Sequence, residues 1–79
     1  MTPTLFASQE RLLIQRSRKN PNKPVRVYPG LYYIYINSVL YEIKRFDQYG
    51  WTWCQYGFNG NDLFRTYSEA KTSLLNFAK

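Results

Sequence analysis

A β-hairpin between Leu31 and Phe46 is the sequence feature that most limits what this chain can fold into. The segments "LYYIYI" and "VLYEIKRF" are rich in β-branched and aromatic residues, and Asn37-Ser38 separates them. Two such runs with two polar residues between them predict a tight hairpin, because Asn tolerates the positive φ that a type I′ turn requires.

The register of this hairpin predicts one apolar face, because directly opposed residues lie on the same side of a sheet. That face would carry three cross-strand pairs, which are Ile36 with Val39, Ile34 with Tyr41 and Tyr32 with Ile43. The opposite, outer face would pair Tyr35 with Leu40, Tyr33 with Glu42 and Leu31 with Lys44. Aromatic side chains are therefore expected on both sides of the sheet.

The segment "WTWCQY" at residues 51–56 predicts a third strand, for which two registers are open. A four-residue loop, "DQYG", pairs Phe46 with Trp51 and leaves Trp51 and Trp53 on the outer face. A three-residue loop with a glycine bulge turns the strand over and buries both tryptophans. We prefer the four-residue loop, because the alternative brings Gln55 onto the apolar face.

A C-terminal helix is predicted by "TYSEAKTSLLNFAK". Thr66 and Glu69 form a capping-box pattern, and Ala70, Leu74 and Phe77 recur at helical spacing, so one side of this helix should cover the sheet. The predicted fold is α+β, with a three-stranded antiparallel β-sheet and a C-terminal α-helix packed on one face.

The N-terminal part allows a second, short helix over residues 5–17, with Ser8 as its N-cap. Its apolar side would consist of Leu5, Phe6, Leu12, Leu13 and Ile14. The segment "RKNPNKPVRVYPG" that follows contains three prolines and predicts an extended connector. We therefore divide the chain into a basic arm with this helix and connector, residues 1–30, and the sheet with its C-terminal helix, residues 31–79.

Composition argues against several functions. The chain has one Cys, Cys54, and no His, which excludes an intrachain disulfide and a Cys/His zinc cluster and removes the commonest general acid–base. We expect no enzyme activity, no cofactor and no metal, with Cys54 as a small buried hydrophobic residue. No signal peptide or membrane span is evident, which predicts a cytoplasmic protein without a membrane partner.

The positive charge is concentrated near the N-terminus. Residues 1–30 contain six Lys and Arg residues against Glu10 alone, a net charge of +5, whereas residues 31–79 contain five against four acidic residues, a net charge of +1. Such asymmetry is typical of a basic arm that meets a polyanion.

Three explanations for the aromatic outer face remain open. The N-terminal helix could fold back over the rings and bury them. The rings could instead contact nucleic acid, with Lys and Arg neutralising phosphates. They could also form a protein interface, in which Tyr, Trp and Arg typically anchor binding.

The order of a basic arm, three short strands and a helix opening with Phe64, Thr66, Glu69 and Ala70 resembles two families of DNA-binding domain. They are the arm-binding N-terminal domain of phage tyrosine integrases and the plant AP2 domain. The resemblance covers about residues 24–79 and implies that the sheet reads DNA. The matching outward positions are Tyr33, Tyr35, Lys44, Phe46, Trp51 and Trp53. AP2 sheets carry several arginines there, whereas this chain has rings and Glu42, which leaves room for a protein target.

The sequence thus predicts a small, non-catalytic nucleic-acid-binding module, with duplex DNA as the favoured target. The arm would bind phosphates and the outer face would orient the complex. The predicted binding residues are Arg16, Arg18, Lys19, Lys23, Arg26, Tyr33, Tyr35, Lys44, Arg45, Phe46, Trp51 and Trp53. The alternative is a phage or mobile-element accessory protein that inhibits a host protein complex, of the anti-defence type. A homodimer through a sheet edge is a further expectation.

Overall fold

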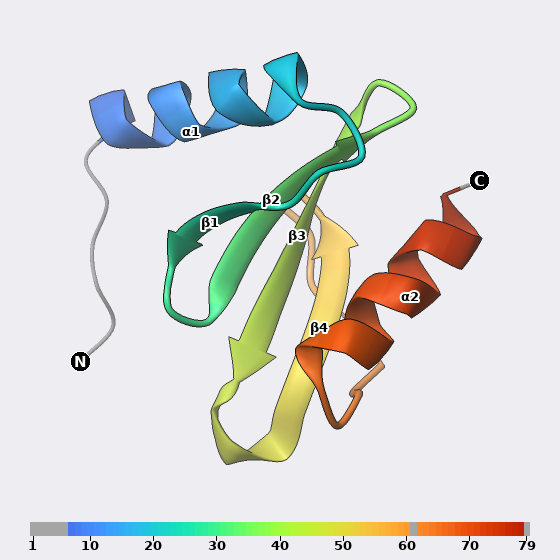
Figure 1. Ribbon diagram of the computed structural model, residues 1–79. Helices are drawn as coiled ribbons and strands as arrows, with labels where there is room; N and C mark the ends of the chain where they lie inside the picture. The colour runs from blue at the N-terminus through green and yellow to red at the C-terminus, as the bar shows by residue number, and fades with distance from the viewer. Residues whose placement is uncertain (1–6, 61, 79) are drawn as a thin grey trace.

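The computed structural model describes residues 7–60 and 62–78, and it shows one antiparallel sheet between two helices (Figure 1). In chain order, the elements are α1 (Ala7–Lys19), β1 (Val25–Tyr28), β2 (Leu31–Ile36), β3 (Val39–Phe46), the 3₁₀ turn η1 (Asp47–Tyr49), β4 (Gly50–Gln55) and α2 (Tyr67–Phe77). The strand order is β1-β2-β3-β4. The α+β class is confirmed, but the prediction of three strands is wrong, because the sheet has four.

The β2–β3 hairpin has the predicted register. All six expected pairs are present, from Leu31 opposite Lys44 to Ile36 opposite Val39. Asn37 and Ser38 have φ values of 50° and 66°, the positive values that a type I′ turn requires. The face that carries Ile34 and Ile43 forms the core and is covered by α2, so we call it the α2 face.

Helix α2 is capped and packed much as its sequence predicts. The Thr66 hydroxyl accepts a hydrogen bond from the Glu69 backbone N–H at 3.1 Å, which satisfies a donor that the helix itself leaves unpaired. Ala70 and Leu74 are fully buried against the sheet. Phe77 differs from the prediction: it is 66% exposed, because it lies on the flank of the helix rather than beneath it.

The predicted register of the third strand, now β4, is wrong. The β3–β4 loop has three residues, so Phe46 pairs with Gly50, Arg45 with Trp51 and Ile43 with Trp53. The strand is therefore turned over, and both tryptophans lie on the α2 face, where they pack against the core. This register does not bury Gln55, because Gln55 is the last residue of β4 and its side chain is exposed.

Strand β1 was predicted as an extended connector, and it instead pairs with β2 at the edge of the sheet. Pro24 and Pro29 lie just outside it and do not interrupt its ladder. An edge strand hydrogen-bonds on one side only, so flanking prolines are compatible with it. They also limit pairing of this edge with another chain.

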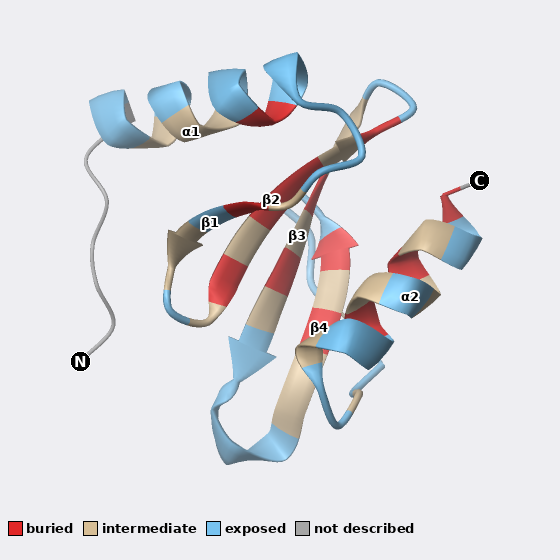
Figure 2. Cartoon of the chain, in the orientation of Figure 1, coloured by how far each residue is buried: buried red, intermediate tan, exposed pale blue. Residues whose placement is uncertain are grey.

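Helix α1 covers the opposite side of the sheet, which we call the α1 face and which carries Tyr33 and Tyr35. The helix extends to Lys19, and Ser8 lies inside it rather than at its N-cap. Leu5 and Phe6 lie outside the described residues. Figure 2 shows α1 mostly exposed, in contrast to the buried centre of the sheet. No helix in the described part of the chain has the length and apolar character to cross a membrane.

Candidate nucleic-acid and partner interface

The predicted binding residues do not form one surface. Four of them, Arg16, Arg18, Lys19 and Lys23, belong to α1 and the turn after it. The side chains on the α1 face are Tyr33, Tyr35, Lys44 and Phe46. The remaining four, on the α2 side of the sheet, are Arg26, Arg45, Trp51 and Trp53. The predicted residues are therefore divided among three separate parts of the molecule.

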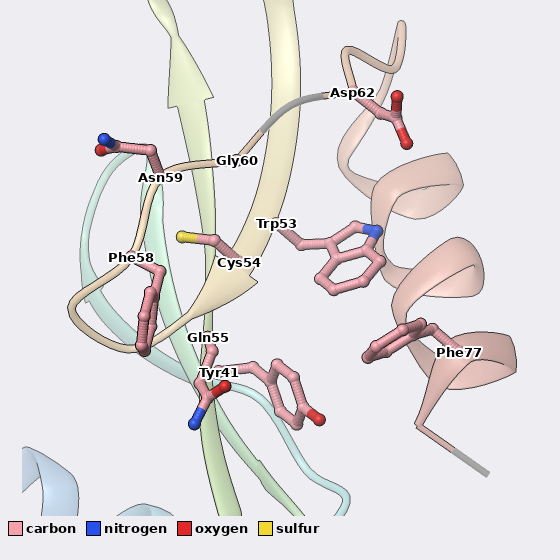
Figure 3. Close-up of a pocket in the computed structure, with 9 residues that line it drawn as sticks. All are labelled: Tyr41, Trp53, Cys54, Gln55, Phe58, Asn59, Gly60, Asp62 and Phe77. Atoms are coloured by element: carbon pink, nitrogen blue, oxygen red, sulfur yellow. The ribbon is translucent and has the colours of Figure 1, made fainter.

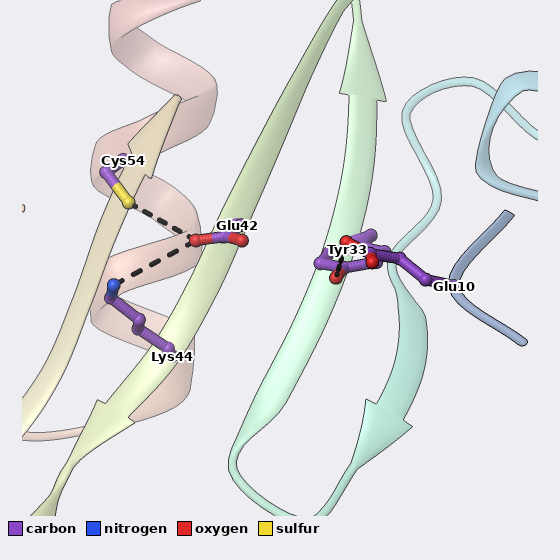
Figure 4. A network of polar contacts seen from close by, with 5 residues as sticks. All are labelled: Glu10, Tyr33, Glu42, Lys44 and Cys54. Carbon is purple, nitrogen blue, oxygen red and sulfur yellow. Dashed lines mark hydrogen bonds and ion pairs between the residues drawn. The ribbon is translucent and has the colours of Figure 1, made fainter. Parts of the chain in front are cut away.

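Glu10 is turned inward, onto the sheet. Its carboxylate accepts hydrogen bonds from the hydroxyl groups of Tyr33, at 3.5 Å, and of Tyr56. Figure 4 shows Glu10 and Tyr33 side by side. The hydrogen bond to Glu10, with burial, raises the pKa of Tyr56 to about 12. Burial, and next the charge of Glu10, raises the pKa of Tyr33 above its ordinary value. The one acidic residue among residues 1–30 is thus used to attach α1.

The outward side of α1 is consequently basic. We define the basic surface as Arg11, Arg16, Arg18, Lys19 and Lys23, all of which are exposed. The ion pair found among the described residues is Lys44 with Glu42, so none of these five cations is paired with a carboxylate there. Arg18 lies over the ring of Tyr35, with its guanidinium carbon 5.9 Å from the ring centroid.

Arg11 belongs to this surface, although the sequence-based prediction did not include it. It lies seven positions before Arg18, two helical turns away, so the two share a side of α1. That spacing was the signal that could have identified it. The turn that follows is held by Asn20, whose backbone N–H and side-chain amide both donate to the Arg16 carbonyl, at 3.2 and 3.0 Å.

The tyrosines of the α1 face are covered to different extents. Tyr33 is 3% exposed and Tyr35 is half-buried beneath α1. Of the three explanations for the aromatic outer face, cover by the N-terminal helix therefore applies to Tyr33 and Tyr35. The contact differs from the predicted one, however: Leu12, expected on the inner side of the helix, is 64% exposed.

The two tryptophans are structural. The indole Nε1 of Trp53 donates to the Ser73 hydroxyl at 3.1 Å, which fixes β4 to α2. The ring of Trp51 lies 5.4 Å from that of Tyr67, which in turn stacks on Tyr32 at 4.4 Å. An outward, DNA-reading position for Trp51 and Trp53 is thus incompatible with this fold.

A small polar network joins β3 and β4 on the α1 face (Figure 4). Lys44 Nζ is 3.9 Å from Glu42 Oε2, and the Cys54 thiol donates to the same oxygen at 3.6 Å. Burial raises the pKa of Glu42, and Lys44 opposes this effect. Burial also raises the pKa of the Cys54 thiol, which favours the unreactive protonated form. No group of three His, Cys, Asp or Glu side chains that could hold a metal occurs in residues 7–60 and 62–78.

A second exposed region lies at the η1 end of the sheet, at the bottom of Figure 1, away from α1. Phe46 and Tyr49 are 52% and 63% exposed, and their ring centroids are 5.8 Å apart. Arg45 is also exposed, and its Nε donates to the Asp47 carbonyl at 3.2 Å. This aromatic tip, Arg45 to Tyr49, retains two of the predicted binding residues.

The outer edge of β4 is partly covered. Trp51 and Phe64 form an antiparallel bridge, with N–H···O distances of 2.7 Å in both directions. Such cover reduces the number of backbone groups that a second chain can pair with.

No protein-family model matches this chain, and neither the curated proteins nor the solved structures gave a significant match. The resemblance to integrase arm-binding and AP2 domains stays a prediction.

Proposed function

We propose that this protein binds nucleic acid, with duplex DNA as the favoured target, through the basic surface of α1. The observation that carries the proposal is the separation of charge on this helix. Glu10 is used against the sheet, whereas the cations face solvent without carboxylate partners among the described residues. A helix of 13 residues is about 20 Å long, and a major groove about 12 Å wide admits an α-helix.

The sheet then acts as a scaffold rather than as the contact surface. Long cationic side chains mainly meet phosphates, which gives affinity that depends little on base sequence. Arg26 and Lys44 lie outside the basic surface, and Tyr33 and Tyr35 support α1 from below. The contact surface is therefore the helix that covers the aromatic face of the sheet, and not that face itself.

The test is the salt dependence of binding to a random-sequence duplex. For each phosphate contact, the slope of log K against log salt is about −0.9. The double variant Arg16→Ala/Lys19→Ala should therefore flatten the slope by about 1.8, if both side chains contact phosphates. The matched control is Arg65→Ala/Lys71→Ala, which removes the same charge from the other side of the sheet. If both double variants change the slope equally, the net charge of the protein alone attracts the duplex, which would contradict a binding site on α1.

A second candidate function is inhibition of a host protein complex, as in accessory proteins of phages and mobile elements. The exposed ring pair of Phe46 and Tyr49 favours it, because exposed aromatic side chains are typical of protein interfaces. Phe46→Ala/Tyr49→Ala should then abolish capture of the partner complex and leave DNA binding unchanged. A partner retained by this variant and lost by Arg16→Ala/Lys19→Ala would instead assign the protein contact to α1.

A further inference from the structure

A pocket of 270 Å³ lies beside β4, away from the basic surface (Figure 3). Its aromatic wall consists of Tyr41, Trp53 and Phe77, on the α2 side of the strand. The ring of Phe58 lies on the opposite side. Pockets for drug-sized ligands are usually about 300 Å³ or larger. The volume here suits a single side chain better than a cofactor.

The walls of the pocket are held in place by contacts from several elements. The Trp53 indole is anchored to Ser73, and its ring centroid lies 4.9 Å from that of Phe77 and 6.2 Å from that of Tyr41. The loop that forms the other side turns back by a hydrogen bond from the Phe58 N–H to the Gln55 carbonyl at 2.9 Å.

Gly60 brings the same loop close to β4. A Cβ at this position would collide with the Thr52 hydroxyl and press on the Trp53 carbonyl. The pocket thus depends on a glycine as well as on the ring contacts, and it has defined walls before any ligand is present.

The charge of the pocket is opposite to that of the chain. The protein carries a net charge of +6, yet none of the described residues that line the pocket is basic, and Asp62 supplies a carboxylate. Within residues 7–60 and 62–78, Asp62 forms no ion pair. A cation held there would meet π-faces and a carboxylate, with no basic residue among the described residues that line the pocket.

Two exposed rings flank this site. Phe58 is 62% and Phe77 is 66% exposed, although both border the pocket. Exposed apolar side chains grouped around a cavity are typical of binding sites. They would cover the aliphatic part of a long cationic side chain whose charged end reaches Trp53 and Asp62.

We propose that this pocket binds the side chain of an arginine or lysine in an extended peptide segment of a partner protein. The cation lies against the Trp53 ring, the Phe77 ring covers the aliphatic part of the side chain, and Asp62 provides the opposite charge. The inference does not depend on nucleic-acid binding by α1, since the two sites share no residue.

The probe is the capped peptide acetyl-Gly-Gly-Arg-Gly-Gly-amide, titrated into the intact protein and followed by the indole N–H resonances in NMR spectra. The control peptide carries citrulline, which is neutral and nearly isosteric with arginine. The arginine peptide should shift the Trp53 resonance and leave that of Trp51 in place, and the citrulline peptide should bind about two- to fivefold more weakly. Equal shifts with both peptides, or no shift at Trp53, would overturn the proposal.

Two variants locate the interaction. Asp62→Asn and Phe77→Ala should each weaken binding of the arginine peptide by about two- to fivefold. Both residues are exposed enough for the fold to tolerate the change. Phe46→Ala, which truncates an exposed phenylalanine at the η1 end, is the matched control and should bind as wild type. If Phe46→Ala weakens binding as much as Phe77→Ala does, the pocket is not the site.

Discussion

The two helices cover opposite faces of one sheet, and they are held by different interactions. Helix α2 places Ala70 and Leu74 against Ile34 and Ile43, and all four side chains are completely buried. Its N-terminus is capped by Thr66. This is an apolar contact whose stability arises from removing surface from water.

Helix α1 presents polar groups to the sheet. Glu10 is hydrogen-bonded to two tyrosine hydroxyls, and Ser17 is fully buried with an Oγ that has no hydrogen-bond partner among the described residues. Among the apolar side chains of α1, Leu12 is 64% exposed, and Leu13 and Ile14 are half-buried. Burying a polar group without a partner costs free energy, so this contact should be much weaker than that of α2.

The difference assigns different roles to the two helices. A segment with few buried apolar contacts opens locally at a lower free energy than the core does. We therefore expect α2 to share the global stability of the protein and α1 to open separately. The solvent side of α1 carries the basic surface, so the helix that contributes less to stability is the one proposed to bind nucleic acid.

The largest expected effect concerns α2. Leu74→Ala should lower the free energy of unfolding by about 2–5 kcal/mol, because it leaves a cavity at a fully buried position. Leu12→Ala on α1 makes the same chemical change at an exposed position and should cost about 0.5 kcal/mol or less. Urea unfolding measures both. Similar losses for the two variants would contradict the proposed difference between the helices.

A smaller and local effect is expected for Glu10→Ala. The variant lacks the carboxylate that accepts hydrogen bonds from Tyr33 and Tyr56, so the docking of α1 should be weaker by about 1 kcal/mol. This value takes into account that the contact is partly exposed to solvent. Amide hydrogen exchange should become faster in α1 and stay unchanged in β3 and α2. The control is Asp47→Asn, which removes the same charge at an exposed position far from α1. Faster exchange throughout the sheet would show that α1 is part of the cooperative core.

The parts of the fold that were predictable from sequence are those decided locally. The Asn37-Ser38 turn fixes the β2–β3 register, and the capping pair of Thr66 and Glu69 marks the start of α2. The register of β4 was not predictable in this way, because a one-residue difference in the loop is decided by which face α2 covers. Strand β1 was missed because prolines are compatible with an edge strand, and an edge cannot be recognised before the sheet order is known.

The candidate site shows the same division. The excess of cations near the N-terminus is visible in the composition, and four of the five residues of the basic surface were predicted from it. The direction in which each side chain of α1 points was not predictable from the sequence. The inner side of α1 is selected by Tyr33 and Tyr56, which are distant from it in sequence. The apolar pattern of α1 therefore predicted its inner side only in part. Leu13 and Ile14 are half-buried as expected, whereas Leu12 is exposed and Glu10 contacts the sheet.

The smallest expected effect is a pH dependence of α1 docking. The pKa of Tyr56 rises from its ordinary value of 10 to about 12 in the folded protein, chiefly through the hydrogen bond to Glu10. A raised pKa means that the stabilisation is fully present below pH 10 and is lost as the pH rises through about 12. Far-UV circular dichroism should then report loss of helix in this range for the wild type.

The variant Tyr56→Phe lacks the hydroxyl, so the docking of α1 should be weaker at neutral pH by about 0.5 kcal/mol. The docking should also change less on alkaline titration, and the change that remains is due to Tyr33. Identical alkaline titrations of the two proteins would show that the contact between Tyr56 and Glu10 does not hold α1 in place.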